Sequence, residues 1–355
     1  MKPGNVLKPL GVFVVVIAVI LAGTAVVATL SGSGSGAQAD GEDIQGQSPE
    51  QFQPENAIAT SAPEDGELSV DGDGEEKRIL VDSGHGNRYS QLELTPVEEA
   101  LVQAGHEVDY TPDTGSNGGF GESNYNETLR QYDAVLIVQP TSSFTDAEIA
   151  GLEAYAEGGG RVVVLGEPPQ LTVSGGFTAQ VSEVRFGAQD LTNEFGLRMG
   201  SDGLYNIEDE QNDNNYESIV ANPDGDTDLT EGVDSVTFDS AGFVVQTGDD
   251  AEVRMRATSG TQTLERRQSG EYPVVAQNGN FVLVADTSFL KSSELYDMDN
   301  EQFVNNLLEF LVSGDKDEDV PEGSSSGDGG FGSDGGDGGD GQSSNGPTTT
   351  PTATP

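Results

Sequence analysis

The sequence predicts an α/β protein: a doubly wound parallel sheet with an inserted β subregion, joined to one N-terminal transmembrane helix. Three observations support this fold class. Short β-branched runs alternate with helical segments over residues 77–314, as a parallel sheet covered by helices requires. A less regular, strand-rich stretch at about 171–272 interrupts the alternation. An apolar run at 10–30 precedes the whole domain.

The apolar run at 10–30 is long enough to cross a bilayer. About 20 residues at 1.5 Å each cover the roughly 30 Å hydrocarbon core, and Lys2 and Lys8 favour keeping the N-terminus 1–9 in the cytoplasm. The segment predicts a single-pass protein of the cell membrane whose main domain is extracytoplasmic. The alternative is a secretory signal cleaved after residues 37–39, although the apolar core of such signals spans only about 7–15 residues.

The first strand of the domain is expected at 78–82, a run of aliphatic residues. A helix is predicted to start at the tetrad 95–98 (Thr-Pro-Val-Glu), which combines the spacing of a capping box with a proline in the first turn, and to end at Gly105. A strand follows at 106–110. We expect this strand to be internal and His106 to serve only in packing.

The alternation continues with a strand at 132–138 and a second capping box at Thr145 and Glu148. The helix that it starts should end at the glycines 158–160, before a strand at 161–166. The inserted β subregion is irregular. The elements expected from there on are a helix at 186–195, antiparallel strands at 235–238, 243–245 and 253–256, a buried strand at 281–286 and a closing helix ending near Gly314.

The segments flanking the domain have the composition of disordered chain. Residues 31–76 are rich in Gly, Ser, Gln, Asp and Glu, which predicts a disordered acidic linker. Residues 315–355 form a Gly/Ser/Asp tail that ends in Thr and Pro and is similar to an O-glycosylated stalk. We expect a tether on one side of the domain and a disordered tail on the other.

The chain is strongly acidic. Its 62 acidic and 15 basic residues give a formal net charge of −47. Such a charge destabilises a compact domain at low ionic strength, whereas molar salt shortens the screening length to about 3 Å. We therefore interpret the surface as that of a halophile. The absence of a basic patch argues against nucleic acid as a partner, because nothing would neutralise its phosphates.

Two groups of motifs resemble one known family. The strand and turn ending in 82–87 (Asp-Ser-Gly-His-Gly-Asn) and the helix, glycines and strand at 144–164 are similar to the domain of unknown function (DUF) 4350 family, within the class I glutamine amidotransferase-like folds. The segment 286–290 and the closing helix resemble the end of that family and of gliding-motility-type auxiliary subunits of ABC transporters. The resemblance implies a flavodoxin-like or amidotransferase-like fold over 77–314 and says more about fold than about reaction.

The chain lacks the nucleophile of true glutamine amidotransferases. Those enzymes place a cysteine on a tight strand-to-helix turn, where histidine activates it. The corresponding turn here is 166–169 (Gly-Glu-Pro-Pro), and the whole chain has no cysteine. We predict no glutaminase activity and no catalytic residue of that type. Ser83 is a weak substitute, because a serine and a histidine two residues apart on a turn seldom form an in-line relay.

Five polar residues follow predicted strands and are candidates for a binding site at the carboxyl edge of the sheet, where doubly wound folds open their crevices. They are Asp82, His85, Asn87, Glu167 and Asp286. Asp82, His85 and Asp286 are also weak candidates for a metal site, since imidazole and carboxylate are metal ligands. The alternative is structural, with the aspartates capping turns and His85 bonded locally. No cofactor is predicted. Asn126 starts an N-glycosylation acceptor triplet on a predicted polar loop.

Three functions remain open from the sequence. The first is a membrane-anchored binding or accessory module of a transporter or envelope complex. The second is a metal- or carboxylate-dependent hydrolase acting on envelope glycans or peptides. The third is a structural spacer held between a tether and a stalk.

Overall fold

The computed structural model describes residues 66–70, 74–111, 122–174, 180–208, 211–213 and 215–321. The predicted transmembrane helix, most of the linker and most of the tail lie outside these residues. Among the residues that are described, no helix is both long and apolar enough to cross a membrane.

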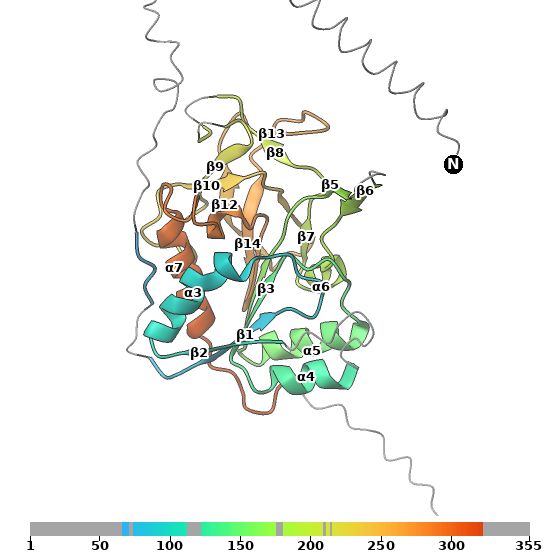
Figure 1. Ribbon diagram of the computed structural model, residues 1–355, viewed down its shortest axis with the longest axis vertical. Coiled ribbons are helices and arrows are strands. Elements are labelled where there is room, and N and C mark those ends of the chain that lie inside the picture. Colours follow the sequence, from blue (N-terminus) through green and yellow to red (C-terminus); the bar gives the residue numbers. More distant parts are fainter. Residues whose placement is uncertain are drawn as a thin grey trace, which may run out of the picture. The chain divides into compact units, whose positions relative to one another are not determined.

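Nine strands form one central sheet in the order β10-β9-β12-β14-β15-β4-β3-β1-β2 (Figure 1). Their bounds are β1 Arg78–Asp82, β2 Glu107–Tyr110, β3 Ala134–Val138, β4 Arg161–Leu165, β9 Ser218–Pro223, β10 Val236–Asp239, β12 Glu252–Ala257, β14 Pro273–Asn278 and β15 Phe281–Val284. The strands β15-β4-β3-β1-β2 pair in parallel, and the remaining pairs are antiparallel. The parallel half has the order of a flavodoxin-like sheet, with its switch point between β1 and β3.

Helices cover both faces of the parallel half. The described helices are α3 Gln91–Gln103, α4 Glu122–Leu129, α5 Asp146–Glu157, α6 Gln189–Glu194 and α7 Asn300–Val312, with short 3₁₀ turns η3 Asp228–Thr230 and η4 Ser288–Leu290. Figure 1 shows α4 and α5 side by side, away from α3 and α7. Along β1, Ile79 and Val81 pack in one core with α3 and α7, whereas Leu80 packs in a second core with α4, α5 and α6. Alternate residues therefore serve two cores, as a doubly wound sheet requires.

The strand-rich stretch is divided between the central sheet and smaller sheets, whereas the sequence suggested one inserted subregion. The strands expected near 235–238 and 253–256 are β10 and β12, which extend the central sheet beyond β14 and β15. Strand β14 pairs with β15 through a tight hairpin, and β12, β9 and β10 continue the sheet from β14. Three two-stranded sheets remain: β5 Gln170–Ser174 with β6 Gln180–Val184, β7 Leu197–Met199 with β11 Val244–Gln246, and β8 Leu204–Tyr205 with β13 Gln262–Thr263.

The first helix starts upstream of the predicted position. Helix α3 begins at Gln91, after a complete capping box formed by Ser90 and Glu93, so the tetrad 95–98 lies inside it. Pro96 cannot donate the hydrogen bond that Leu92 would accept within the helix. Leu92 is 83% exposed, so water can satisfy its carbonyl group. The prediction failed because two capping-box patterns, 90–93 and 95–98, follow each other closely and the proline favoured the second one.

Strand β2 lies at the edge of the sheet, so the prediction of an internal strand at 106–110 is wrong. None of its four residues is fully buried. His106 lies just before the strand and is 6% exposed, and its Nδ1 accepts a hydrogen bond from the Lys77 amide at 3.1 Å. The second capping box is confirmed, since Thr145 and Glu148 open α5.

Candidate functional site

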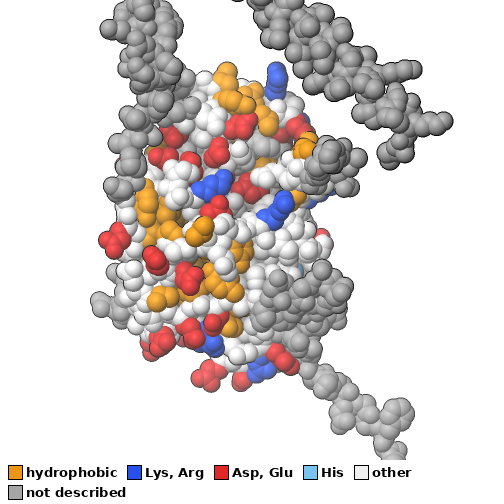
Figure 2. All heavy atoms as spheres, in the orientation of Figure 1, with side chains coloured by type: hydrophobic (Ala, Val, Ile, Leu, Met, Phe, Trp, Pro, Cys, Tyr) orange, Lys and Arg blue, Asp and Glu red, His pale blue; other side chains and the backbone are white. Residues whose placement is uncertain are grey.

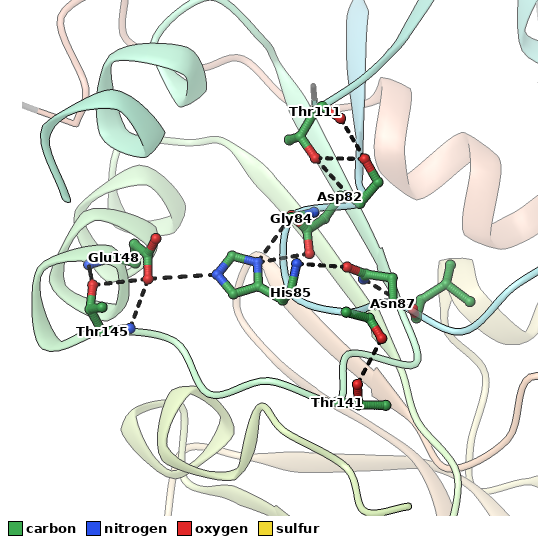
Figure 3. A network of polar contacts seen from close by, with 11 residues as sticks. Asp82, Gly84, His85, Asn87, Thr111, Thr141, Thr145 and Glu148 are labelled. Carbon is green, nitrogen blue, oxygen red and sulfur yellow. Dashed lines mark hydrogen bonds and ion pairs between the residues drawn. The ribbon is translucent and has the colours of Figure 1, made fainter. Parts of the chain in front are cut away.

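The loop after β1 turns His85 back over the end of its own strand (Figure 3). His85 Nδ1 lies 2.9 Å from Asp82 Oδ2 and 3.1 Å from Asp82 Oδ1. Gly86 makes this turn with a φ of 62°, and a Cβ there would lie 2.8 Å from Thr141 Oγ1. Glycine therefore suits this position both for its backbone conformation and for its size.

The other ring nitrogen of His85 faces helix α5. Its Nε2 lies 3.6 Å from Glu148 Oε2. The same oxygen accepts hydrogen bonds from the Thr145 amide at 2.7 Å and the Thr145 hydroxyl at 2.9 Å. The imidazole stacks on Phe144 at 3.6 Å between ring centroids and meets the edge of Tyr125 at 5.3 Å. A residue that sequence reasoning treated only as a helix cap is thus the second carboxylate of a buried triad.

The triad holds His85 as an imidazolium. Burial lowers the pKa of His85, but hydrogen bonds and charge from Asp82 and Glu148 outweigh it and raise the pKa to about 9. For Glu148, burial raises the pKa, yet His85 and the Thr145 donors reverse this and lower it. His85 is 6% exposed and Asp82 is fully buried. Both ring nitrogens lie beside carboxylates, so neither is free for a metal, and the raised pKa keeps His85 mostly protonated near pH 7.

The β1–β3 switch point is occupied by the protein itself. Asn87 accepts a hydrogen bond from the His85 amide at 3.0 Å and donates to the Val138 carbonyl at the end of β3 at 3.1 Å. Ser83 donates its hydroxyl hydrogen to the Thr111 carbonyl, so it is not directed at His85. Two of the candidate residues, His85 and Asn87, therefore tie the loops together where a flavodoxin-like fold would open its crevice.

Glu167 and Asp286 form a second group, at the ends of β4 and β15. Glu167 Oε1 accepts hydrogen bonds from the Thr287 hydroxyl and from the Thr287 amide, the latter at 3.0 Å. Asp286 Oδ1 accepts from the Ser288 amide at 2.7 Å and the Ser288 hydroxyl at 2.6 Å. Asp286 Oδ2 is buried and has no partner among the described residues. Gln139, at the end of β3, accepts a hydrogen bond from the Glu167 amide at 2.6 Å.

Both carboxyl groups of this second group favour the protonated form. Burial raises the pKa of Glu167 to about 7, although the Thr287 donors oppose the shift. Burial and the nearby Glu167 raise the pKa of Asp286 well above its usual range. Two adjacent buried carboxyls cannot both ionise cheaply, so the charge of Glu167 opposes the ionisation of Asp286.

A cavity of about 800 Å³ opens beside Glu167. Its walls come from the β4–β5 turn, the β5–β6 hairpin and the loops around β7, β8 and β13. Glu167, Pro168, Leu171, Glu183, Arg185 and Arg198 are among the residues that line it. Asp286 is not one of them, so of the two buried carboxyls only Glu167 reaches the cavity.

The five sequence candidates therefore fall into two groups, Asp82, His85 and Asn87 in one and Glu167 and Asp286 in the other. The structure does not bring the proposed metal ligands Asp82, His85 and Asp286 together. Across the described part of the chain, one cluster of three potential ligands has its ligand atoms within 4.8 Å of one another, formed by Asp213, Glu294 and Asp297.

The predicted glycosylation acceptor lies on a helix and not on a polar loop. Asn126 belongs to α4, and its side-chain amide donates a hydrogen bond to the Ala147 carbonyl of α5 at 3.0 Å. Its Oδ1 is buried. The amide nitrogen that would carry a glycan thus holds the α4–α5 contact.

The turn after β4 differs from a nucleophile turn in more than its residue type. Glu167, Pro168 and Pro169 lead from β4 into the two-stranded β5–β6 sheet, and the next helix, α6, comes only after that sheet. A strand-to-helix turn that would expose a nucleophile is therefore missing at this position.

Comparison with solved structures gives matches of low sequence identity. The structure titled "mmIFT52 N-terminal domain" matches with a TM-score of 0.50 and 15% identity, covering 68% of this chain and 99% of that one. A putative thua-like protein from Bacteroides uniformis matches with a TM-score of 0.40 and 16% identity, covering 70% and 95%. The glutaminase domain of Trypanosoma brucei CTPS matches with a TM-score of 0.30 and 8% identity, covering 66% and 93%.

The first of these likenesses shows a shared fold. No curated protein sequence matches the chain. The model of one family, described as domain of unknown function (DUF4350), matches residues 97–308, which include the carboxyl edge with Glu167 and Asp286. The chain is a member of the DUF4350 family.

Proposed function

We propose that this protein is a membrane-anchored, extracytoplasmic binding module that lacks a catalytic nucleophile and serves as an accessory component of a transporter or envelope complex. The observation that carries the proposal is the end of β4. Where a related enzyme would need a nucleophile on a strand-to-helix turn, this chain has Glu167 between Gly166 and two prolines, followed by a β hairpin.

The state of His85 supports a role without catalysis. A general base must offer a free nitrogen in its neutral form near the working pH. His85 has both nitrogens beside carboxylates and a pKa raised to about 9. Its contacts join β1 to α5, which is a structural task.

The 800 Å³ cavity supports a role in binding. Ligand sites are concave and lie at the carboxyl edge of open α/β sheets. This cavity begins at Glu167 on that edge. The membrane anchor in this proposal rests on the apolar run at 10–30. The acidic composition of the chain suits a high-salt environment.

Cross-linking and affinity purification of the tagged full-length protein from native membranes test this proposal. The matched variant is Leu264→Arg, because Leu264 lines the cavity and is 45% exposed. The substitution should therefore leave the fold intact. We expect transporter or envelope subunits to be recovered in stoichiometric amounts with the wild type and depleted with the variant. Recovery of no membrane subunit would refute the accessory role.

A hydrolase is the second candidate, and the raised pKa of Glu167 at the cavity wall is what favours it. A carboxylate pair acting on a glycosidic bond must face the substrate from both sides. Asp286 is buried away from the cavity, so Glu167 would need a different carboxylate of the cavity wall, such as Glu217, as its partner, and this requirement ranks the candidate lower. Turnover of envelope glycans or peptides that is abolished in Glu167→Gln, at unchanged stability, would reverse the ranking.

A further inference from the structure

The β5–β6 hairpin presents an unusually apolar surface. Leu171, Val173 and Val181 are 75%, 69% and 62% exposed. Val173 and Val181 are directly opposite each other in the antiparallel register, and Leu171 lies two residues from Val173. Since side chains alternate between the faces of a strand, these three share one face of the hairpin.

That face continues into the cavity. Leu171 pairs with Glu183 across the hairpin, and both residues line the cavity beside Glu167. The Val173–Val181 pair extends the same face outward from the cavity. The apolar face of the hairpin and the cavity therefore form one continuous surface, which we call the hairpin groove.

Within the described part of the chain, both strands of the hairpin have an unpaired edge. Strands β5 and β6 pair with each other in a sheet of two, and no backbone hydrogen bond joins either of them to another described strand. An exposed strand edge with apolar side chains is a template for one more strand. The hairpin thus offers main-chain hydrogen bonds together with a hydrophobic face.

The charged residues around the groove indicate the sign of the charge that a partner would carry there. The ion pair between Arg185 and Glu183, at 2.6 Å, removes one charge of each sign from the cavity wall. Among the described residues, Glu217 and Glu265 also line the cavity, whereas Arg198 is the one further guanidinium in that lining. The remaining wall is therefore acidic and complementary to a cationic side chain.

We propose that the hairpin groove binds an extended peptide segment of a partner protein, which adds a strand to the hairpin, extends the apolar face of Leu171, Val173 and Val181 with its own alternate side chains, and directs a lysine or arginine toward Glu217 and Glu265. This inference rests on the proposed function, because it names the kind of partner that the binding module would take. Exposed apolar strands favour aggregation, and a bound partner strand would cover this face.

A defined peptide tests the inference. The probe is a fluorescein-labelled peptide, Lys-Val-Thr-Val-Thr-Val-Lys, titrated with the full-length protein in detergent and followed by fluorescence anisotropy. We expect saturable binding that weakens by about tenfold or more when the three apolar residues are changed to serine. Control substitutions at Leu92 and Val102, exposed apolar residues of α3, should leave the affinity within about twofold.

Two further comparisons separate the parts of the proposal. Methylating alternate backbone nitrogens of the peptide removes donors needed for strand addition and should abolish binding. Changing Glu217 and Glu265 to Gln should weaken binding of the lysine peptide, whereas Glu99→Gln, on the exposed face of α3, should not.

Several outcomes would overturn the inference: no binding, equal binding of the methylated peptide, or equal losses in the groove and control variants. None of them would affect the purification of membrane subunits. Recovery of a stoichiometric complex together with failure of the peptide would retain the accessory role and reject strand addition. Peptide binding without any recovered complex would retain strand addition and reject the accessory role.

Discussion

His85 illustrates how a residue that resembles a catalytic histidine can be a structural cation. Its surroundings are apolar on the ring faces, through Phe144 and Tyr125, and anionic at both nitrogens. Removing one partner of such a buried set leaves charges without compensation, which typically costs about 3–5 kcal/mol. The residue links the turn after β1 to the first turn of α5.

The raised pKa of His85 predicts a pH-dependent stability. A group whose pKa is higher in the folded state contributes fully below its unfolded pKa of 6.5 and loses that contribution as the pH rises through about 9. Thermal unfolding followed by circular dichroism should therefore show the melting temperature falling from pH 6.5 to about 9. His85→Gln should be less stable throughout and should lack the part of this fall that His85 causes.

His106 provides the matched control, because the chain has only two histidines. Burial lowers the pKa of His106, so its effect has the opposite sign: the unfolded state binds the proton more tightly, and stability is lost as the pH falls below 6.5. His106→Gln should remove that acid-side loss and keep the alkaline one. An alkaline slope that survives in His85→Gln would refute the assignment of His85 as an imidazolium.

At the residue scale, the sequence predicted local pairs and missed distant ones. The turn 82–87 is contiguous, so the contact between Asp82 and His85 could be expected from the residues alone. Glu148 is far away in sequence and reaches His85 only because α5 packs against the end of β1. Glu167 and Asp286 were predicted to share the crevice of His85, but β3 separates their strands from β1.

At the element scale, two capping boxes with the same hydrogen-bond pattern have different roles. Ser90 and Glu93 cap α3 on an exposed segment, whereas Thr145 and Glu148 cap α5 where Glu148 is 5% exposed and shared with His85. Only the second cap is part of a buried ionic group.

We expect Thr145→Ala to destabilise the protein more than Ser90→Ala, which should cost about 1 kcal/mol, a typical value for a lost cap. Thr145→Ala removes a donor to Glu148 as well as the cap, so the charge that faces His85 is less well held. Urea unfolding of both variants, alone and combined with His85→Gln, measures the difference. Additive effects of Thr145→Ala and His85→Gln would contradict the shared role of Glu148.

Helix and strand positions were largely predictable because they depend on local periodicity and caps. Strand β1 and helix α5 lie where the pattern placed them. The assignment of β10 and β12 to the central sheet was not predictable, because alternation shows that a strand is half buried without showing which strand it pairs with. The register with β14 and β9 is a long-range property.

At the scale of the whole molecule, the net charge of −47 opposes the compact state. Figure 2 shows acidic side chains over the visible face and only a few basic ones. Self-repulsion of this kind is reduced by salt, since the screening length shortens from about 10 Å at 0.1 M to about 3 Å at 1 M.

We therefore expect the melting temperature to rise when KCl is increased from about 0.1 M to about 1 M, where screening is nearly complete. Sucrose at matched osmolality is the control, because it favours compact states without screening charge. A melting temperature that does not respond to KCl, or that sucrose raises equally, would reject charge repulsion as the main destabilising term and weaken the interpretation of the surface as halophilic.

The position of β15 in the parallel half of the sheet has a consequence for how the chain folds. Strand β4, with four of its five residues buried, pairs with β3 on one side and with β15 on the other, and β15 is formed only by residues 281–284. Until synthesis reaches that point, the backbone N–H and C=O groups along one edge of the buried strand β4 lack their partner strand. We therefore expect the sheet to close late in synthesis, and a chain truncated before β15 to be a substrate for proteases and not a smaller folded protein.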